Sequence, residues 1–317
     1  MRSTMLVVAI AALGPLTAQS ELTTAVRSCA PLEGSEVPGA RLPVLKERRY
    51  VMSGAARPLL FWIKRDDIGL ARIVWRRGKD GARGYELLVG TDPARAPRRL
   101  NRWGFVSEET LGASGSVLAL MTGSQDTSYE DEADIATRGA SGGEFRTILS
   151  RMQDGATTWR LARMRTPDAL TVHQIADALE CLQTGGSADV HRRAVSADVR
   201  SGFLVAVADL VDSTVAASLD RPGAPARRTA AVPYVFGEQM YELRVRDVGP
   251  VVVPYDGRQI PALKTSFQTR AVETGARTRF ELTVGTTSDT AGVPLTIEWQ
   301  PRWWLKVKLH LEAPDAR

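Results

Sequence analysis

Near its C-terminus the chain alternates between apolar and polar residues without a break. Every second residue from Trp303 to Leu311 is apolar, and the intervening positions carry Trp304 and then lysine, lysine, histidine and glutamate. Successive side chains of a strand point to opposite faces of its sheet, so the run predicts a strand with one dry and one wet face. Such a strand is typical of an antiparallel sheet with a single covered face.

The same alternation recurs along much of the chain. Residues 71–76 and 85–89 alternate on either side of a Gly-Lys-Asp-Gly turn at 78–81, which predicts a hairpin. A strand at 59–64 is expected to end at a turn at 66–69, where the sequence reads Asp-Asp-Ile-Gly. Further strands are predicted at 103–108, 116–121, 145–152, 158–164, 241–246, 279–284 and 293–299.

Two mid-chain segments have helical spacing. Thr171 and Gln174 form a possible capping box, apolar residues follow every three or four positions, and Gly185-Gly186 ends the run. Residues 202–219 repeat in the same way but are rich in β-branched residues, so a strand is the alternative. Strands on both sides of a helical segment at about 168–219 predict an α+β, β-dominated fold. Its sheet is expected to be antiparallel and curved, half-barrel or barrel-like, with one or two helices in mid-chain.

The N-terminus has the pattern of an export signal. Arg2 precedes an apolar run that Gly14-Pro15 interrupts, and Ala18-Gln19-Ser20 has the spacing of a cleavage site. We expect residues 1–20 to be a signal peptide, 21–42 an N-terminal arm, and 43–312 a single β-rich domain. The apolar run is too short for a membrane-spanning helix, and no later segment is long and apolar enough, so we predict a periplasmic or secreted protein.

The net charge is +5, from 41 basic and 36 acidic residues. Cations concentrate between Arg41 and Trp103, whereas 104–137 carries acidic residues and no basic ones. The basic stretch predicts a cationic surface that includes Arg95, Arg98, Arg99 and Arg102. The anions available to an exported protein are lipid headgroups, glycans and cell-wall polymers, so nucleic acid is not expected as a partner. A solvated surface without a partner is the alternative.

Cysteine and histidine are scarce. Cys29 and Cys181 could form one disulfide in an oxidising compartment, or remain two separate thiols. The three histidines are scattered, and no Cys/His cluster has metal-ligand spacing. The Gly-rich stretch at 112–115 lacks the lysine that would hold a nucleotide phosphate. We therefore expect neither a metal nor a cofactor.

One segment of the sequence matches a catalytic motif. Residues 139–143 fit the G-x-S-x-G pattern around Ser141, in which a hydrolase exposes its serine between a strand and a helix. An acidic polar stretch precedes this motif and an alternating strand follows it, which favours a Gly/Ser loop. The acidic cluster at 126–134 lacks the ligand spacing of a calcium loop.

The seven tryptophans lie on or beside predicted strands. They are expected mainly in the core. Inward-facing aromatic residues of a half-closed sheet can also line a groove for a hydrophobic ligand. Trp62, Trp75 and Trp304 are the candidate ligand-binding residues, and Trp62 and Trp304 lie out of phase with the apolar faces of their strands.

Several of these segments also resemble bacterial exported proteins of the domain of unknown function 3108. The similar parts are the strand–Gly–strand unit at 63–75, the Tyr-Val-Phe-Gly turn at 234–237 before Tyr241, and the endings at 280–284 and 292–297. Thr283 departs from the pattern, because the family usually has an aromatic residue there. The resemblance implies an envelope protein with a wrapped antiparallel sheet, and it supplies no catalytic residues.

Two functions remain possible from the sequence. The favoured one is an exported cell-envelope protein that binds or scaffolds a lipid, a glycan or another envelope protein without catalysis. Its partner would be a hydrophobic or anionic envelope component. The alternative is an exported serine hydrolase that uses Ser141. The sequence does not determine the oligomeric state.

Overall fold

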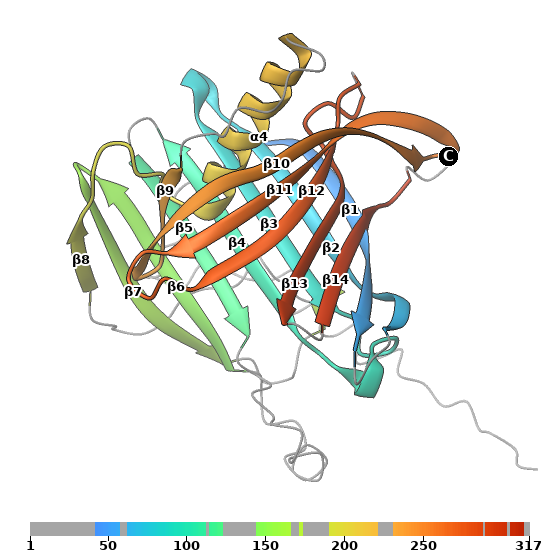
Figure 1. Cartoon of the computed structure of the whole chain (residues 1–317). Coiled ribbons are helices and arrows are strands. Elements are labelled where there is room, and N and C mark those ends of the chain that lie inside the picture. The colour runs from blue at the N-terminus through green and yellow to red at the C-terminus, as the bar shows by residue number, and fades with distance from the viewer. Residues whose placement is uncertain are drawn as a thin grey trace, which may run out of the picture.

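A computed structural model describes residues 42–57, 62–111, 114–122, 144–165, 171–173, 190–220, 231–287, 289–302 and 305–313. Within these residues, fourteen strands form one antiparallel sheet, in the spatial order β8 to β1 followed by β14 to β9 (Figure 1). The strands are β1 (Val44–Ala56), β2 (Ile63–Arg77), β3 (Arg83–Thr91), β4 (Trp103–Leu111), β5 (Ser114–Thr122), β6 (Glu144–Gln153), β7 (Ala156–Arg165), β8 (Val190–Ala194), β9 (Val232–Phe236), β10 (Gln239–Tyr255), β11 (Arg258–Ala271), β12 (Arg277–Gly285), β13 (Pro294–Arg302) and β14 (Leu305–Leu311).

The last strand joins the two halves of the sheet. β14 pairs with β1 in antiparallel register from Tyr50 opposite Leu311 to Ala56 opposite Leu305. Leu309 and Leu311 are buried on one face, whereas Lys306 and His310 are exposed on the other. This confirms the predicted closing strand with one dry and one wet face.

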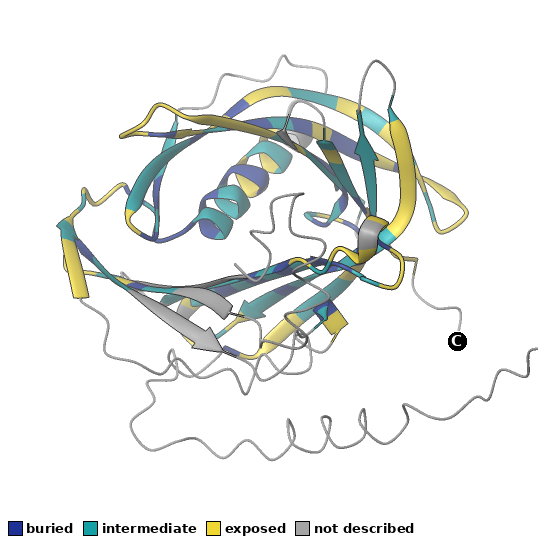
Figure 2. Cartoon of the chain, turned by 90° about the horizontal axis from the view of Figure 1, so that it is seen from below, coloured by how far each residue is buried: buried dark blue, intermediate teal, exposed yellow. Residues whose placement is uncertain are grey.

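The sheet curves around the helix α4 (Phe203–Asp220), which lies between its two halves in Figure 2. We call the face toward α4 the inner face. Ala206 and Leu210 of α4 are buried against Leu243, Phe267 and neighbouring apolar residues of β9–β12. Burial of each large apolar side chain contributes about 2 kcal/mol. The helical prediction for 202–219 is therefore confirmed over the strand alternative. Of the helix predicted from Thr171 to Gly185, Val172 and His173 are helical, and the part after them lies outside the described residues.

The sheet is curved but not closed, because β8 and β9 at its two ends do not pair with each other. The chain between β8 and α4 bridges this opening. Its Arg200 donates its backbone N–H to the carbonyl of Pro233 (2.8 Å) and accepts the N–H of Val235 (3.1 Å). Arg193 of β8 also pairs with Glu273, beyond the end of β11, at 2.7 Å.

The expected turn at residues 66–69 is wrong. These residues lie inside β2, where the pairing with β1 shifts register between Met52 and Gly54. Asp67 has a φ of 55°, so the turn-forming residues produce a β-bulge and not a chain reversal. Gly69 is required there, because an added Cβ would lie 2.1 Å from the carbonyl oxygen of Gly90.

Both faces of β2–β4 are buried, which corrects the expectation of a single covered face. Val74, Leu88 and Phe105 are buried on the outer face, and Ala71 is buried on the inner face. Gly90, also on the outer face, lies so close to Val172 that an added Cβ would be 2.7 Å from its side chain. Alternation alone cannot reveal that a sheet is covered on its second face.

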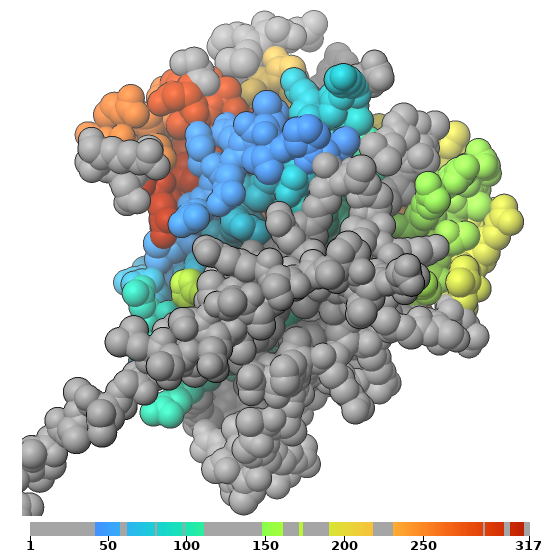
Figure 3. Space-filling view, turned by 180° about the vertical axis from the view of Figure 1, so that it is seen from behind, coloured from blue at the N-terminus to red at the C-terminus, as the bar shows by residue number. Residues whose placement is uncertain are grey.

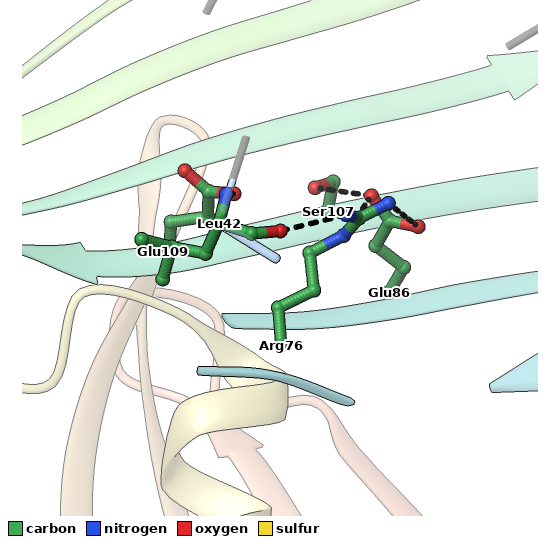
Figure 4. A network of polar contacts seen from close by, with 5 residues as sticks. All are labelled: Leu42, Arg76, Glu86, Ser107 and Glu109. Atoms are coloured by element: carbon green, nitrogen blue, oxygen red, sulfur yellow. Dashed lines mark hydrogen bonds and ion pairs between the residues drawn. The ribbon is translucent and has the colours of Figure 1, made fainter. Parts of the chain in front are cut away.

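A polar network on this outer face holds Leu42 (Figure 4). The backbone N–H of Leu42 donates to Glu109 at 2.9 Å, and its carbonyl accepts from Arg76 at 2.7 Å. Arg76 also pairs with Glu86 at 3.1 Å. Both partners of that ion pair are almost fully buried, so the two charges neutralise each other away from water.

The hairpin of β10 and β11 extends beyond its pairing with β12. Val251 and Val253 near its tip pack against the core that contains Tyr50, Leu309 and Leu311. The hydroxyl of Tyr255 donates to the carbonyl of Glu312 at 3.1 Å. The hairpin tip therefore lies beside the end of β14, as Figure 1 shows.

The predicted hairpin of β2 and β3 is confirmed, with the 3₁₀ turn η1 (Lys79–Gly81) between the strands. The strands predicted at 103–108, 116–121, 145–152, 158–164, 241–246, 279–284 and 293–299 correspond to β4–β7, β10, β12 and β13. Sequence reasoning missed β1, β8, β9 and β11. β1 was missed because charged residues occupy its inner face as well as its outer face.

Candidate anion-binding site on the inner face of the sheet

Lys46 and Arg48 point to the inner face of β1. They precede the fully buried Tyr50 at two-residue intervals, and residues two apart share a face of a strand. Lys46 lies opposite Trp75 of β2, and Arg48 lies opposite Ile73. The pairing of β1 with β2 thus places two adjacent cations beside aromatic and apolar side chains.

The ammonium of Lys46 lies over the ring of Trp75, 5.6 Å from its centroid. Such a contact stabilises a cation through the negative face of the ring. Burial lowers the pKa of Lys46, and repulsion from Arg48 lowers it further. An anion bound between the two cations would relieve that repulsion.

Within the described chain, no carboxylate forms an ion pair with Lys46 or Arg48. Glu47 occupies the outer face of β1, and its carboxylate pairs with Arg49 at 3.5 Å. Arg48 donates to the backbone carbonyl of Glu47 at 2.9 Å, which leaves its positive charge without a countercharge. Two cations without countercharges on a half-buried face are chemically suited to an anion.

Two sets of carboxylates on nearby elements pair with other cations. Asp209 of α4 binds Arg83 at 3.0 Å and Arg200 at 2.6 Å, which fixes the helix to β3 and to its own lead-in. At the tip of the β10–β11 hairpin, Arg258 pairs with Asp256 at 3.7 Å and with Asp289 at 3.4 Å. These pairs leave the charge of Lys46 and Arg48 uncompensated.

Tyrosines complete the surroundings of the two cations. Tyr50 donates its hydroxyl to the carbonyl of Pro294 at 2.9 Å, and Tyr85 lies opposite Trp75 on β3. Burial raises the pKa of Tyr50, Tyr85 and Tyr255 above its ordinary value. These phenols are therefore neutral at physiological pH and can act as hydrogen-bonding and apolar groups. We call Lys46, Arg48 and Trp75, with these three tyrosines, the inner cationic site.

A buried carboxylate holds the N-terminal end of α4. Glu108 of β4 is fully buried and accepts the backbone N–H of Val205 at 2.9 Å, and its other carboxylate oxygen has no partner within the described residues. Burial raises the pKa of Glu108 to about 7, although hydrogen bonds from the first turn of α4 oppose the shift. Sequence reasoning missed this residue, because it looked like one of several acidic residues in a strand.

The structure separates the residues that the sequence singled out. Trp75 belongs to the inner cationic site, whereas Trp62 lies at the opposite end of β2, where the ammonium of Lys306 is 4.7 Å from its ring centroid. Arg95 and Arg99 are exposed near that same end, in the connection between β3 and β4, and so is Arg102. Trp304, Cys29, Cys181 and Ser141 lie outside the described residues, as does the side chain of Arg98.

Among the residues placed by the structure, no three His, Cys, Asp or Glu side chains are grouped so that they could hold a metal ion. No helix within the same residues is long and apolar enough to cross a membrane.

Comparisons with known proteins give a likeness at the level of structure. No family model matches the chain, and no curated protein matches it. A solved structure from Brucella abortus, described as a β-barrel-like protein of domain of unknown function DUF1849, aligns with 87% of this chain and 98% of its own. Its sequence identity is 8% and the TM-score is 0.41, so it assigns no residue role and no activity to this chain. The fold class rests on the observed sheet: a β-dominated protein with one large, curved antiparallel sheet around a helix.

Proposed function

We propose that this chain is an exported cell-envelope protein that binds an anionic, partly apolar molecule at the inner cationic site without transforming it. The observation that carries the proposal is the pair Lys46 and Arg48, which share one half-buried face with Trp75 and have no carboxylate partner in the described chain. Residues 1–20 support export through their signal-peptide pattern.

The side chains around the site favour binding over catalysis. The phenols of Tyr50 and Tyr85 have raised pKa values, so they are neutral and weakly nucleophilic at physiological pH. Lys46, in contrast, carries charge that a phosphate or carboxylate can neutralise. Trp75 and the apolar residues beside it can contact an acyl chain or a sugar ring. The best fit is an anionic headgroup joined to a less polar body.

The test is to identify what the protein carries. The chain is purified from the cell envelope of its expressing cells without detergent and extracted with chloroform and methanol, and both phases are examined by negative-ion mass spectrometry. An anionic lipid is expected in the organic phase at a fixed ratio to protein. An acidic glycan in the aqueous phase would identify the other source of the same headgroup chemistry.

The variants Lys46→Gln and Arg48→Gln, made together, should lose the carried molecule while the fold is kept. Lys79→Gln is the matched control, because Lys79 is exposed on η1 and lies outside the site. Both phases free of anionic compounds, or equal amounts from the double variant and the control, would refute binding at this site. Fractionation of the same cells tests export, which a chain found only in the cytoplasm with an intact N-terminus would contradict.

A further inference from the structure

The end of the sheet opposite the inner cationic site has its own surface chemistry. β1 ends and β2 and β14 begin there, with Ala56 opposite both Ile63 and Leu305. Lys64 and Lys306 flank Ala55 in the same register, so both lie on the outer face with only a methyl group between them. Trp62 lies two residues before Lys64, and Lys306 covers its ring at 4.7 Å.

Exposed groups on the other face of the same end of the sheet accompany these cations, because Ile63 and Arg65 alternate with Lys64 and point to the inner face. Ile63 is 49% exposed, and Leu100 in the connection between β3 and β4 is 37% exposed. That connection lies against β2, because Asp92 donates its backbone N–H to the carbonyl of Ile68 at 2.9 Å and Arg95 pairs with Asp67. We define the Trp62 rim by residues that the structure places at this end: Arg57, Trp62, Ile63, Lys64, Arg65, Arg99, Leu100 and Lys306.

Positive charge predominates at the rim. In the described residues, Lys64, Arg65 and Lys306 form no ion pair, whereas the carboxylates of Asp67 and Asp92 both lie near Arg95. The Nε of Arg57 is buried without a hydrogen-bond partner in the described part of the chain. Asp66 is the remaining acidic residue here, and it is exposed. The rim therefore presents more cations than its own carboxylates neutralise.

The rim thus combines the aromatic ring of Trp62 and the aliphatic side chains of Ile63 and Leu100 with several cations. Aromatic and aliphatic residues flanked by lysine and arginine are typical of surfaces that lie in a membrane interface. Figure 3 shows β1 and β2 at the molecular surface in the view from behind.

We propose that the Trp62 rim docks on the surface of an anionic lipid bilayer. Trp62, Ile63 and Leu100 would enter the interface between headgroups and acyl chains, and Lys64, Arg65 and Lys306 would contact the phosphates. A soluble anion would bind the cations but would not explain exposed isoleucine and leucine beside them. A bilayer surface satisfies both groups at once, and the lysine stems can lie along its apolar boundary.

The test uses the chain isolated from the envelope fraction, with its N-terminus determined so that an uncleaved apolar leader does not contribute. Co-sedimentation is measured with vesicles of phosphatidylcholine alone and of phosphatidylcholine with phosphatidylglycerol. Binding is expected only with the anionic vesicles, should weaken as salt is raised, and should shift tryptophan emission to the blue. No binding to either vesicle at low salt would overturn the proposal.

Variants locate the contact. A lysine near an anionic surface contributes about a fivefold gain in binding, so Lys64→Glu with Lys306→Glu should weaken binding by more than about tenfold. Ile63→Ser should weaken the part of the binding that persists at high salt. Lys79→Glu, an exposed lysine on η1 in the connection at the other end of β2, is the matched control and should bind like the unaltered chain. Equal losses in the rim and control variants would also overturn the proposal.

The docking surface is separate from the inner cationic site, and the two can be told apart. Lys46→Gln with Arg48→Gln should abolish the carried anion yet leave vesicle binding unchanged. Lys64→Glu with Lys306→Glu should weaken vesicle binding, while the anion already carried at the inner cationic site stays bound. Circular dichroism and thermal unfolding of each variant exclude loss of the fold as the cause.

Discussion

Glu108 of β4 accepts a hydrogen bond from the backbone N–H of Val205 in the first turn of α4, at 2.9 Å. The two residues belong to elements far apart in sequence, and Glu108 is fully buried. The first N–H groups of a helix have no partner within the helix, and the helix dipole favours negative charge beside them. A carboxylate of the sheet thus supplies the cap that α4 lacks in its own sequence. This contact fixes where the N-terminal end of the helix lies against the sheet.

Replacement of Glu108 should destabilise the fold through this contact. Glu108→Ala would leave buried N–H groups unsatisfied and open a cavity, with a loss of about 2–4 kcal/mol in the free energy of unfolding. Glu108→Gln keeps an acceptor of the same shape and should lose much less at pH 5. Urea unfolding of both variants measures the difference. If Glu108→Ala loses no more free energy of unfolding than Glu108→Gln, the cap does not hold α4.

The same residue predicts how stability depends on pH. Burial raises the pKa of Glu108 from 4.5 to about 7, so the folded state favours the protonated acid. The contribution of the Glu108 carboxyl to the stability of the fold is fully present below pH 4.5 and is lost as pH rises through about 7. Relative to Glu108→Gln, the unaltered chain should lose about 2 kcal/mol between roughly pH 5 and 8. Parallel pH profiles of the two proteins would contradict this.

The strand pattern of the sequence predicts most of this fold for a physical reason. β14 has one face against the core and one toward water, so its residues alternate, and the alternation gives both the strand and its buried face. α4 follows the same principle with a period of three to four residues, since Ala206 and Leu210 pack inward. The turn residues at 66–69 were misleading because Asp and Gly allow a bulge as well as a reversal.

The candidate site is less predictable because it breaks the pattern. Lys46 and Arg48 take inner-face positions of β1 that a folding pattern reserves for apolar residues, so the strand looks like a charged loop. Trp75 could be selected from the sequence, but its proximity to Lys46 depends on the register of two strands about thirty residues apart, including a bulge between them. Glu108 has no local signal, because its partner Val205 lies on a distant helix.

Gly202 should not tolerate a side chain. An added Cβ would lie 2.3 Å from the carboxylate of Glu108, so Gly202→Ala must displace either the carboxylate or the start of α4. We expect a loss of about 1–3 kcal/mol in the free energy of unfolding. Gly104→Ala is the matched control on β4, since nothing lies within 4 Å of its added Cβ, and it should be neutral or slightly stabilising. Thermal unfolding compares the two, and equal shifts would exclude crowding at Glu108 as the cause.

The ion pair between Arg193 and Glu273, across the opening of the sheet, should contribute little to the stability of the fold. Arg193 and Glu273 lie 2.7 Å apart, but their side chains are 35% and 40% exposed. Water and salt screen such a pair, so Arg193→Gln should change the free energy of unfolding by less than about 1 kcal/mol. Chemical unfolding at low and high salt measures this. A larger loss would show that the opening between β8 and β9 is held by this contact and not by the backbone bonds of Arg200.

The charge of Arg48 should be detectable in the titration of Lys46. The pKa of Lys46 is lowered by burial and then by the charge of Arg48, so Arg48→Gln should raise it toward its ordinary value. NMR titration of a ¹³C-labelled lysine side chain reports that pKa directly, with Lys79→Gln as a variant that should leave it unchanged. An anion bound between the two cations should raise the same pKa in the unaltered chain, because opposite charge favours the protonated amine. If neither removal of Arg48 nor saturation with ligand moves the Lys46 resonance, the two side chains do not form one anion site.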